Sequence, residues 1–133
     1  MQPITPYLTV KGAAQALEFY QKAFGASDIF THPAEDGKRL MHASMTINGG
    51  TVMLSDEFPE HEGTPAPTAG KPTSVAISIL FDSPDQVDAM FAQAVAAGAK
   101  GVMKPEDAFW GDRFAMLDDP FGHRWMLDAP LKK

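Results

Sequence analysis

The stretch Gly49-Gly50-Thr51-Val52-Met53-Leu54 decides the fold, because Gly122-His123-Arg124-Trp125-Met126-Leu127 repeats its pattern 73 residues later. A second pair agrees at the same shift, with Phe24-Gly25-Ala26 matched by Ala97-Gly98-Ala99. The first pair falls in a hairpin pattern and the second at the end of a helical pattern. Two matches at one spacing and in the same context indicate an internal duplication rather than a chance agreement of common residues.

Around the first stretch, the sequence predicts one helix and four strands. Apolar residues recur at helical spacing from Ala13 to Phe24. Gly25 follows them, as is typical of a helix C-terminus. Asn48-Gly49-Gly50 is a strong hairpin signal between two strands. Alternating or β-branched residues predict strands over 4–10, 28–32, 40–47 and 51–55.

The second half repeats this order. Ser83-Pro84-Asp85-Gln86 forms a capping box with proline at the first helical position, and Gly98 ends the helix. Strands are predicted over 74–81, 99–104, 113–117 and 123–128.

The region between the halves, 58–72, holds four prolines and two glycines and reads as a connection. We therefore predict one α+β domain over 1–133, with modules at about 1–57 and 73–133 and a linker at 58–72. Its two tandem βαβββ modules form a cupped mixed sheet with helices on the outer face.

Composition narrows the range of functions. The 133 residues carry a formal charge of −6 without a basic stripe, which argues against nucleic-acid binding. No apolar run is long enough for a membrane helix, and no segment resembles a signal peptide. The absence of cysteine excludes disulfides and thiolate chemistry and is consistent with a cytoplasmic protein.

Three stretches resemble the vicinal oxygen chelate superfamily, also known as the glyoxalase and bleomycin-resistance fold, and within it the PhnB-like branch. They are Pro6–Val10 with Ala16–Tyr20, Met41-His42 through Leu54-Ser55-Asp56-Glu57, and Phe109–Arg113 with Asp119–Trp125. The resemblance covers nearly the whole chain. It implies a cup that holds a ligand on its concave face, and commonly a homodimer.

The resemblance also implies four metal-ligand positions in enzymes of the superfamily, two in each module. In this chain they fall near Thr5, Met53, Ala76 and Met126. None of these side chains suits a divalent zinc, iron or manganese ion. We therefore expect no metal and no other cofactor in the cup.

Several residues have two interpretations. His42 is either a hydrogen-bonded structural residue or a base or ligand donor in the pocket, and His123 either fixes its turn or faces the pocket. Arg113 either binds an anionic ligand or takes part in an internal ion pair. In the second interpretation, Asp112 pairs with Arg113 or with Arg124 and holds the loop in place. Asp56, Glu57, His61 and Glu62 read as a solvated acidic rim rather than a metal site.

The prediction for function is non-metal binding of a small molecule, with sequestration as one form of it. A metal-dependent lyase, isomerase or dioxygenase of the same superfamily is the alternative, and an accessory subunit with a vestigial cup is a third possibility. No nucleophile elbow, phosphate-binding loop or catalytic residue is evident. The expected ligand contacts are Tyr7, Met53, Ser55, Trp110, Arg113, Trp125 and Met126.

Overall fold

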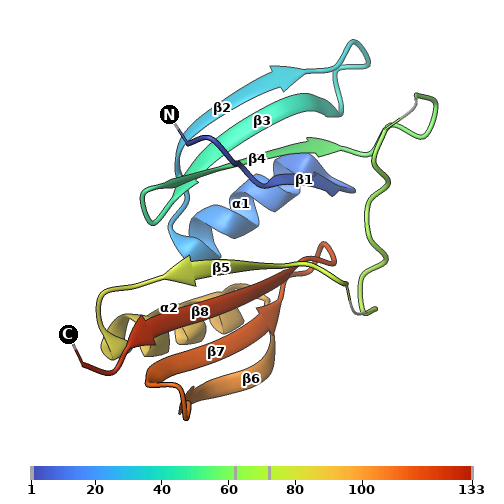
Figure 1. Cartoon of the computed structure of the whole chain (residues 1–133). Coiled ribbons are helices and arrows are strands. Elements are labelled where there is room, and N and C mark those ends of the chain that lie inside the picture. The colour runs from blue at the N-terminus through green and yellow to red at the C-terminus, as the bar shows by residue number, and fades with distance from the viewer. Residues whose placement is uncertain (1, 62, 72, 133) are drawn as a thin grey trace.

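Two βαβββ modules make up the chain, and each contains one helix and one four-stranded sheet (Figure 1). The computed structural model describes residues 2–61, 63–71 and 73–132. The first module consists of β1 (Tyr7–Val10), α1 (Ala13–Phe24), β2 (Ser27–Pro33), β3 (Leu40–Ile47) and β4 (Gly50–Asp56). The second consists of β5 (Ala76–Leu80), α2 (Pro84–Ala97), β6 (Lys100–Asp107), β7 (Asp112–Asp118) and β8 (Arg124–Pro130).

Both sheets have the same topology, as the duplication predicts. The strand orders are β1-β4-β3-β2 and β5-β8-β7-β6. In each sheet the first strand pairs parallel with the last, and the other pairs are antiparallel. The α+β class and the mixed sheets with helices on one side are therefore confirmed (Figure 1).

Local chemistry explains where the elements end. Gly25 has a φ of 67°, a left-handed conformation that favours glycine, and its N–H donates to the carbonyl of Gln21. Asn48 and Gly49 both have positive φ, as a two-residue hairpin turn requires. The first strand begins at Tyr7 rather than at the predicted residue 4, because Pro6 has no N–H to donate to a ladder.

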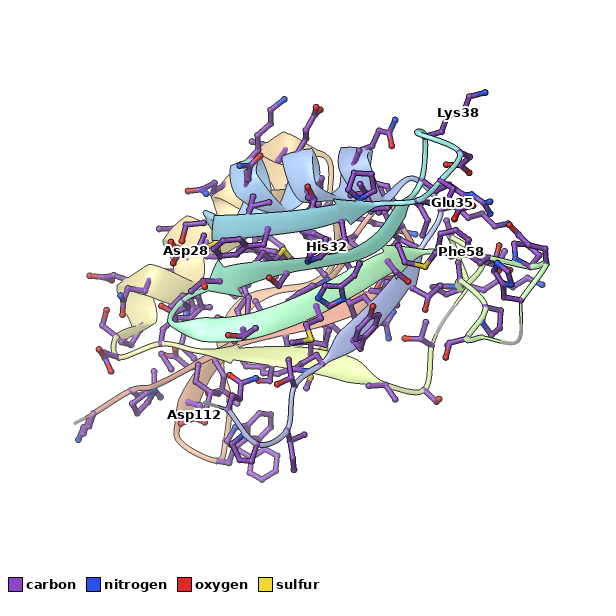
Figure 2. The ribbon with its side chains drawn as sticks, turned by 90° about the horizontal axis from the view of Figure 1, so that it is seen from above. Asp28, His32, Glu35, Lys38, Phe58 and Asp112 are labelled. Atoms are coloured by element: carbon purple, nitrogen blue, oxygen red, sulfur yellow. The ribbon has the colours of Figure 1, made fainter. Side chains whose placement is uncertain are left out.

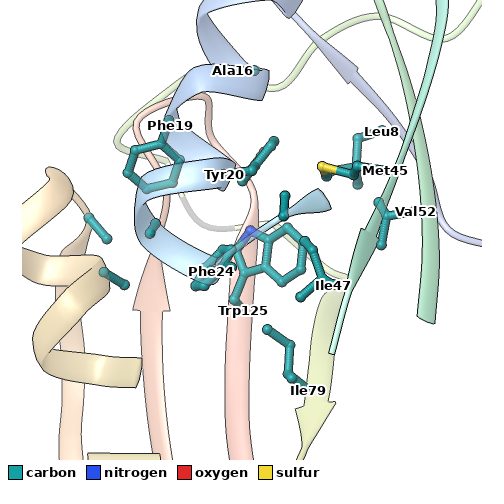
Figure 3. Packing of buried hydrophobic residues seen from close by; sticks show 14 of the residues in the cluster. Leu8, Ala16, Phe19, Tyr20, Phe24, Met45, Ile47, Val52, Ile79 and Trp125 are labelled. Carbon is teal, nitrogen blue, oxygen red and sulfur yellow. The ribbon is translucent and has the colours of Figure 1, made fainter. Parts of the chain in front are cut away.

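The hydrophobic core lies on the helix-facing side of both sheets and continues from one module to the other. Trp125 of β8 is fully buried, and its ring lies 4.7 Å from Phe24 and 5.5 Å from Tyr20 of α1, measured between centroids. Ile47 and Ile79 complete this contact from the two sheets (Figure 3). The modules therefore share one core.

Hydrogen bonds reinforce the junction between the modules. Asn48 donates its side-chain amide to the carbonyl of Leu80 at 2.6 Å, and Tyr20 donates its hydroxyl to Asp119 at 2.6 Å. The relative position of the two sheets is thus set by packing and by polar contacts together. Neither of the described helices has the length and apolarity needed to cross a membrane.

Candidate functional site

The candidate site lies on the open face, by which we mean the side of the two sheets opposite the helices (Figure 2). Successive side chains of a strand alternate between faces, and paired residues of neighbouring strands share a face. Met53 pairs with Tyr7 and Ser44, whereas the neighbouring Leu54 is buried against the helix. In the second sheet, Met126 pairs with Ser78 and Met116 on the open face.

Four of the expected ligand contacts share this open face. Tyr7, Met53 and Ser55 belong to the first sheet, and Met126 belongs to the second. Trp110 lies at the rim, in the β6–β7 turn, where its half-exposed ring packs edge-on against Phe114 at 5.7 Å.

Arg113 and Trp125 lie on the opposite face of their strands, so the structure does not bring them together with the other expected contacts. Arg113 forms ion pairs with Asp88 of α2 at 2.9 Å and with Asp107 at 3.1 Å. Trp125 is part of the core. Each of the two residues follows an open-face neighbour in its strand, and the alternation of the strand turns it towards the helices.

The internal pairs differ from those expected as well. Arg124 pairs with Asp118 at 2.8 Å, and Arg113 pairs with acids outside its own strand. Asp112 therefore forms an ion pair with neither Arg113 nor Arg124. It faces Asp128 instead, a carboxyl group that the sequence patterns did not single out.

Asp128 and Asp112 form a pair of carboxyl groups at the end of the open face far from the linker. Figure 2 shows Asp112 there, with Phe58 at the linker end. Desolvation raises the pKa of Asp128 to about 6, and the hydrogen bond and charge of Asp112 add to the effect. Asp128 therefore keeps its proton to a higher pH than an ordinary aspartic acid does.

Tyr7 and His42 are hydrogen-bonded on the open face of the first module. The Tyr7 hydroxyl lies 2.9 Å from Nδ1 of His42, and the two rings are 5.6 Å apart between centroids. His32 of β2 pairs with His42 in the ladder, and its ring lies 5.8 Å away. Both interpretations of His42 are compatible with this geometry, since its ring is hydrogen-bonded to a tyrosine that lines two cavities.

Two cavities adjoin this pair where the linker meets the sheets, and both are lined by Tyr7 and Thr64. The larger linker cavity has a volume of about 510 Å³, and the smaller linker cavity has a volume of about 300 Å³. The larger cavity is lined by Pro6, Tyr7, Leu8, Thr64, Pro65, Ala66, Pro67, Thr73, Ser74, Val75, Ile77, His123 and Arg124. The smaller cavity is lined by Tyr7, Thr9, Met41, Ser55, Asp56, Phe58, His61, Gly63 and Thr64.

His123 joins the modules at the wall of the larger cavity. Its Nε2 lies 2.9 Å from the carbonyl oxygen of Thr9, and its backbone N–H donates to Asp119. The interpretation that His123 fixes its turn is consistent with both contacts. The ring also borders the cavity, so the second interpretation stays open.

The predicted acidic rim is corrected at Asp56. This side chain is buried and accepts hydrogen bonds from the backbone N–H groups of Gly12, Ala13 and Leu40. Glu57 accepts a hydrogen bond from the N–H of Ala66 in the linker. The prediction for Glu62 lies outside the described residues.

The side chains at the superfamily's metal-ligand positions do not fit a divalent transition metal. Met53, Ala76 and Met126 face the open side with two thioethers and a methyl group, which such ions bind poorly. Thr5 precedes β1, and its hydroxyl donates to the carbonyl of Gln2 at 3.4 Å. Among the described residues, no group of three His, Asp or Glu side chains is arranged to hold a metal ion.

Comparisons with known proteins agree with this architecture. The protein Rv0887c of Mycobacterium tuberculosis H37Rv is 42% identical over 134 residues, which span 98% of this chain and 75% of that protein. The PhnB protein of Bacillus cereus, a putative 3-demethylubiquinone-9 3-methyltransferase, superposes with a TM-score of 0.68 at 24% identity, over 96% of this chain and 99% of its own.

The fosfomycin resistance protein FosX of Listeria monocytogenes, complexed with Mn(II) and sulfate, has a TM-score of 0.71 at 16% identity, over 97% and 90% of the two chains. At such identities, FosX and the PhnB protein show a shared fold. A sequence profile extends the match across both modules, from residue 3 to residue 127. The chain belongs to the Glyoxalase/Bleomycin resistance protein/Dioxygenase superfamily.

Proposed function

We propose that this PhnB-like protein binds a small, partly apolar organic molecule where its open face meets the linker, without a metal ion, and that binding or sequestration is its function. The larger linker cavity carries the proposal. Its volume of about 510 Å³ is within the range of small-molecule sites, and prolines and aliphatic side chains form much of its wall. A few polar groups, among them Tyr7, His123 and Arg124, are placed to orient a ligand.

The methionines of the open face support the same proposal. Met53, Met116 and Met126 present flexible, polarizable side chains that adapt to irregular apolar molecules. The same side chains make the face a poor place to polarise a substrate oxygen through a metal. Holding a molecule therefore suits this surface better than activating one.

A thermal-shift screen followed by titration calorimetry tests the proposal, with a panel of aromatic metabolites and amphipathic antibiotics. Val75→Trp fills the mouth of the larger cavity from an exposed position and should abolish binding of any hit while the protein stays folded. Val102→Trp, at an exposed position of β6 outside the cavity lining, is the matched control and should bind normally. Hits that bind both variants equally would place the site elsewhere.

A metal-dependent lyase, isomerase or dioxygenase is the rival function, since the FosX structure of the same fold contains Mn(II). Elemental analysis of protein purified without chelators separates the two. Stoichiometric manganese, zinc or iron, together with turnover that a chelator abolishes, would refute the non-metal proposal.

A homodimer and a cytoplasmic location complete the proposal. Large apolar side chains that are mostly exposed support the dimer, because an interface would remove them from water. They include Ile4 at 85%, Leu80 at 70% and Phe109 at 98% exposure. Light scattering after size exclusion tests the oligomeric state, and a monomeric mass at micromolar concentration would contradict it.

A further inference from the structure

The Tyr7–His42 pair offers a hydrogen-bond donor to a ligand whichever way its own proton lies. If the Tyr7 hydroxyl donates to Nδ1 of His42, the imidazole proton is on Nε2 and points away from the pair. If Nδ1 carries the proton instead, the Tyr7 hydroxyl is free to donate. Within the described part of the chain, Nε2 of His42 has no hydrogen-bond partner, and Tyr7 is 50% exposed. The pair is thus exposed to solvent and has a hydrogen-bond donor left for a ligand.

The surroundings of the pair favour an anion. The positions that β1, β3 and β4 turn to the open face carry hydroxyl, imidazole and thioether groups and no carboxylate: Tyr7, Thr9, His42, Ser44, Thr46, Thr51, Met53 and Ser55. Asp56, an acid in the lining of the smaller cavity, is turned to α1 and accepts three backbone N–H groups, and Glu57 beside it accepts the N–H of Ala66. The chain has a net charge of −6, but the open face of the first module carries little of that negative charge.

The second module has the opposite polarity. Its open face carries Asp128 and Asp112, and Asp118, whose charge is balanced by Arg124. The carboxyl groups of the second module repel a carboxylate on a ligand, whereas the open face of the first module can accept it. The open face therefore orients an acidic molecule with its anionic group towards the first module.

The cavities determine where the rest of such a molecule lies. Tyr7 lines both linker cavities, so a group bound by its hydroxyl is at their junction, and His42 lies beside it through its hydrogen bond to Tyr7. An apolar body attached to that group extends into the larger cavity, between Pro65, Val75 and Ile77.

On these grounds we infer that Tyr7 and His42 bind the carboxylate of a small organic acid whose aromatic or branched body occupies the larger linker cavity. The inference rests on the proposed binding function and adds the class of ligand. It assigns the pair a role in recognition, since the pair donates a hydrogen bond to the carboxylate. The same bond to the oxygen of an uncharged amide is weaker.

Binding of 3-phenylpropionate and of its amide, 3-phenylpropionamide, to the full chain tests the inference. Calorimetry or NMR titration should give the acid an affinity about fivefold to tenfold higher than the amide, as expected of a charge-assisted hydrogen bond. Tyr7→Phe and His42→Gln should each remove most of that preference and change the affinity for the amide little. His61→Gln, a histidine of the smaller cavity wall, is the matched control and should keep the preference.

Equal affinity for acid and amide would overturn the inference and leave the proposed binding function standing. An equal loss in His61→Gln would overturn it too, since a general charge effect would then explain the preference. If neither compound binds, this ligand class is refuted, whereas the broader screen still decides the proposed function. Imidazole ¹⁵N shifts of His42 in the unaltered protein give a second readout, because a hydrogen bond to the carboxylate should move them more than a hydrogen bond to the amide.

Discussion

At the scale of single residues, Asp119 shows how a buried carboxylate is made stable. One oxygen accepts the Tyr20 hydroxyl at 2.6 Å and the indole N–H of Trp125 at 2.9 Å. The other accepts the backbone N–H groups of Phe121 and His123. Burial and the charge and hydrogen bond of Asp119 raise the pKa of Tyr20 well above its ordinary value, so the phenol remains a donor.

We predict that Asp119→Asn destabilises the protein by about 2–4 kcal/mol, because the amide removes the charge and turns an N–H group towards donors. Urea unfolding followed by circular dichroism measures the change. Asp118→Asn is the adjacent control, where only a partly exposed ion pair is lost and the effect should be clearly smaller. Equal losses for the two variants would contradict the role given to Asp119.

Asp128 gives a prediction of pH dependence. Its pKa is raised from 3.8 to about 6, so the folded protein holds this proton more tightly than the unfolded chain does. The contribution of Asp128 to stability is therefore fully present below about pH 4 and is lost as the pH rises to about 6. Asp128→Asn should flatten this part of the pH profile, with a gain near neutral pH of about 1 kcal/mol after allowance for solvent screening.

Urea midpoints between pH 4 and pH 7 measure the difference between the two proteins. Asp112→Ala is an informative partner variant, since it removes the hydrogen bond and charge that add to desolvation and should lower the pKa of Asp128. An NMR titration of the Asp128 carboxyl carbon with a midpoint at its ordinary value of 3.8 would refute the prediction.

At the scale of elements, the N-terminus of helix α1 is capped by a side chain from strand β4. Its N-cap position is Gly12, which has no side chain to accept the free N–H groups. Asp56, at the end of β4, accepts the N–H groups of Gly12 and Ala13 with one oxygen and that of Leu40 with the other. One carboxylate thus ties helix α1 to strands β3 and β4.

We predict that Asp56→Asn costs about 1–3 kcal/mol, because the amide nitrogen then faces a backbone N–H and the negative charge at the helix N-terminus is lost. Thermal unfolding and hydrogen exchange of the first turn of α1 both report the effect. Asp85→Asn, in the exposed first turn of α2, removes a carboxylate without breaking a described side-chain hydrogen bond. A similar loss of stability in both variants would argue against this cap.

The elements also show how far the sequence predicts the site. Every helix and strand was predicted in the right order, and β3 and α1 were predicted with their observed bounds. Met126 and Trp125 were both expected in the cup, although neighbours in a strand point to opposite faces. Strand identity was thus predictable from periodicity, whereas the face of each residue required the pairing register.

At the scale of the whole molecule, the two modules share a core, so we predict that they unfold together. Trp125 of the second module packs on Phe24 and Tyr20 of the first, and losing either module would expose this cluster (Figure 3). In a Trp110→Phe background, the remaining tryptophan fluorescence should therefore have the same urea midpoint as far-UV circular dichroism. Two separated transitions would show that the modules are independent.

By itself, the sequence determined the duplication, the order of elements, the turns and the family resemblance, because these depend on local periodicity and on glycine, proline and capping residues. Only the tertiary structure decided that Tyr7 meets His42, that Arg113 pairs with Asp88, and that Tyr20 reaches Asp119. Such contacts join residues far apart in the chain. They depend on strand register and on the packing of one module against the other, and a slip of one residue would reverse every face.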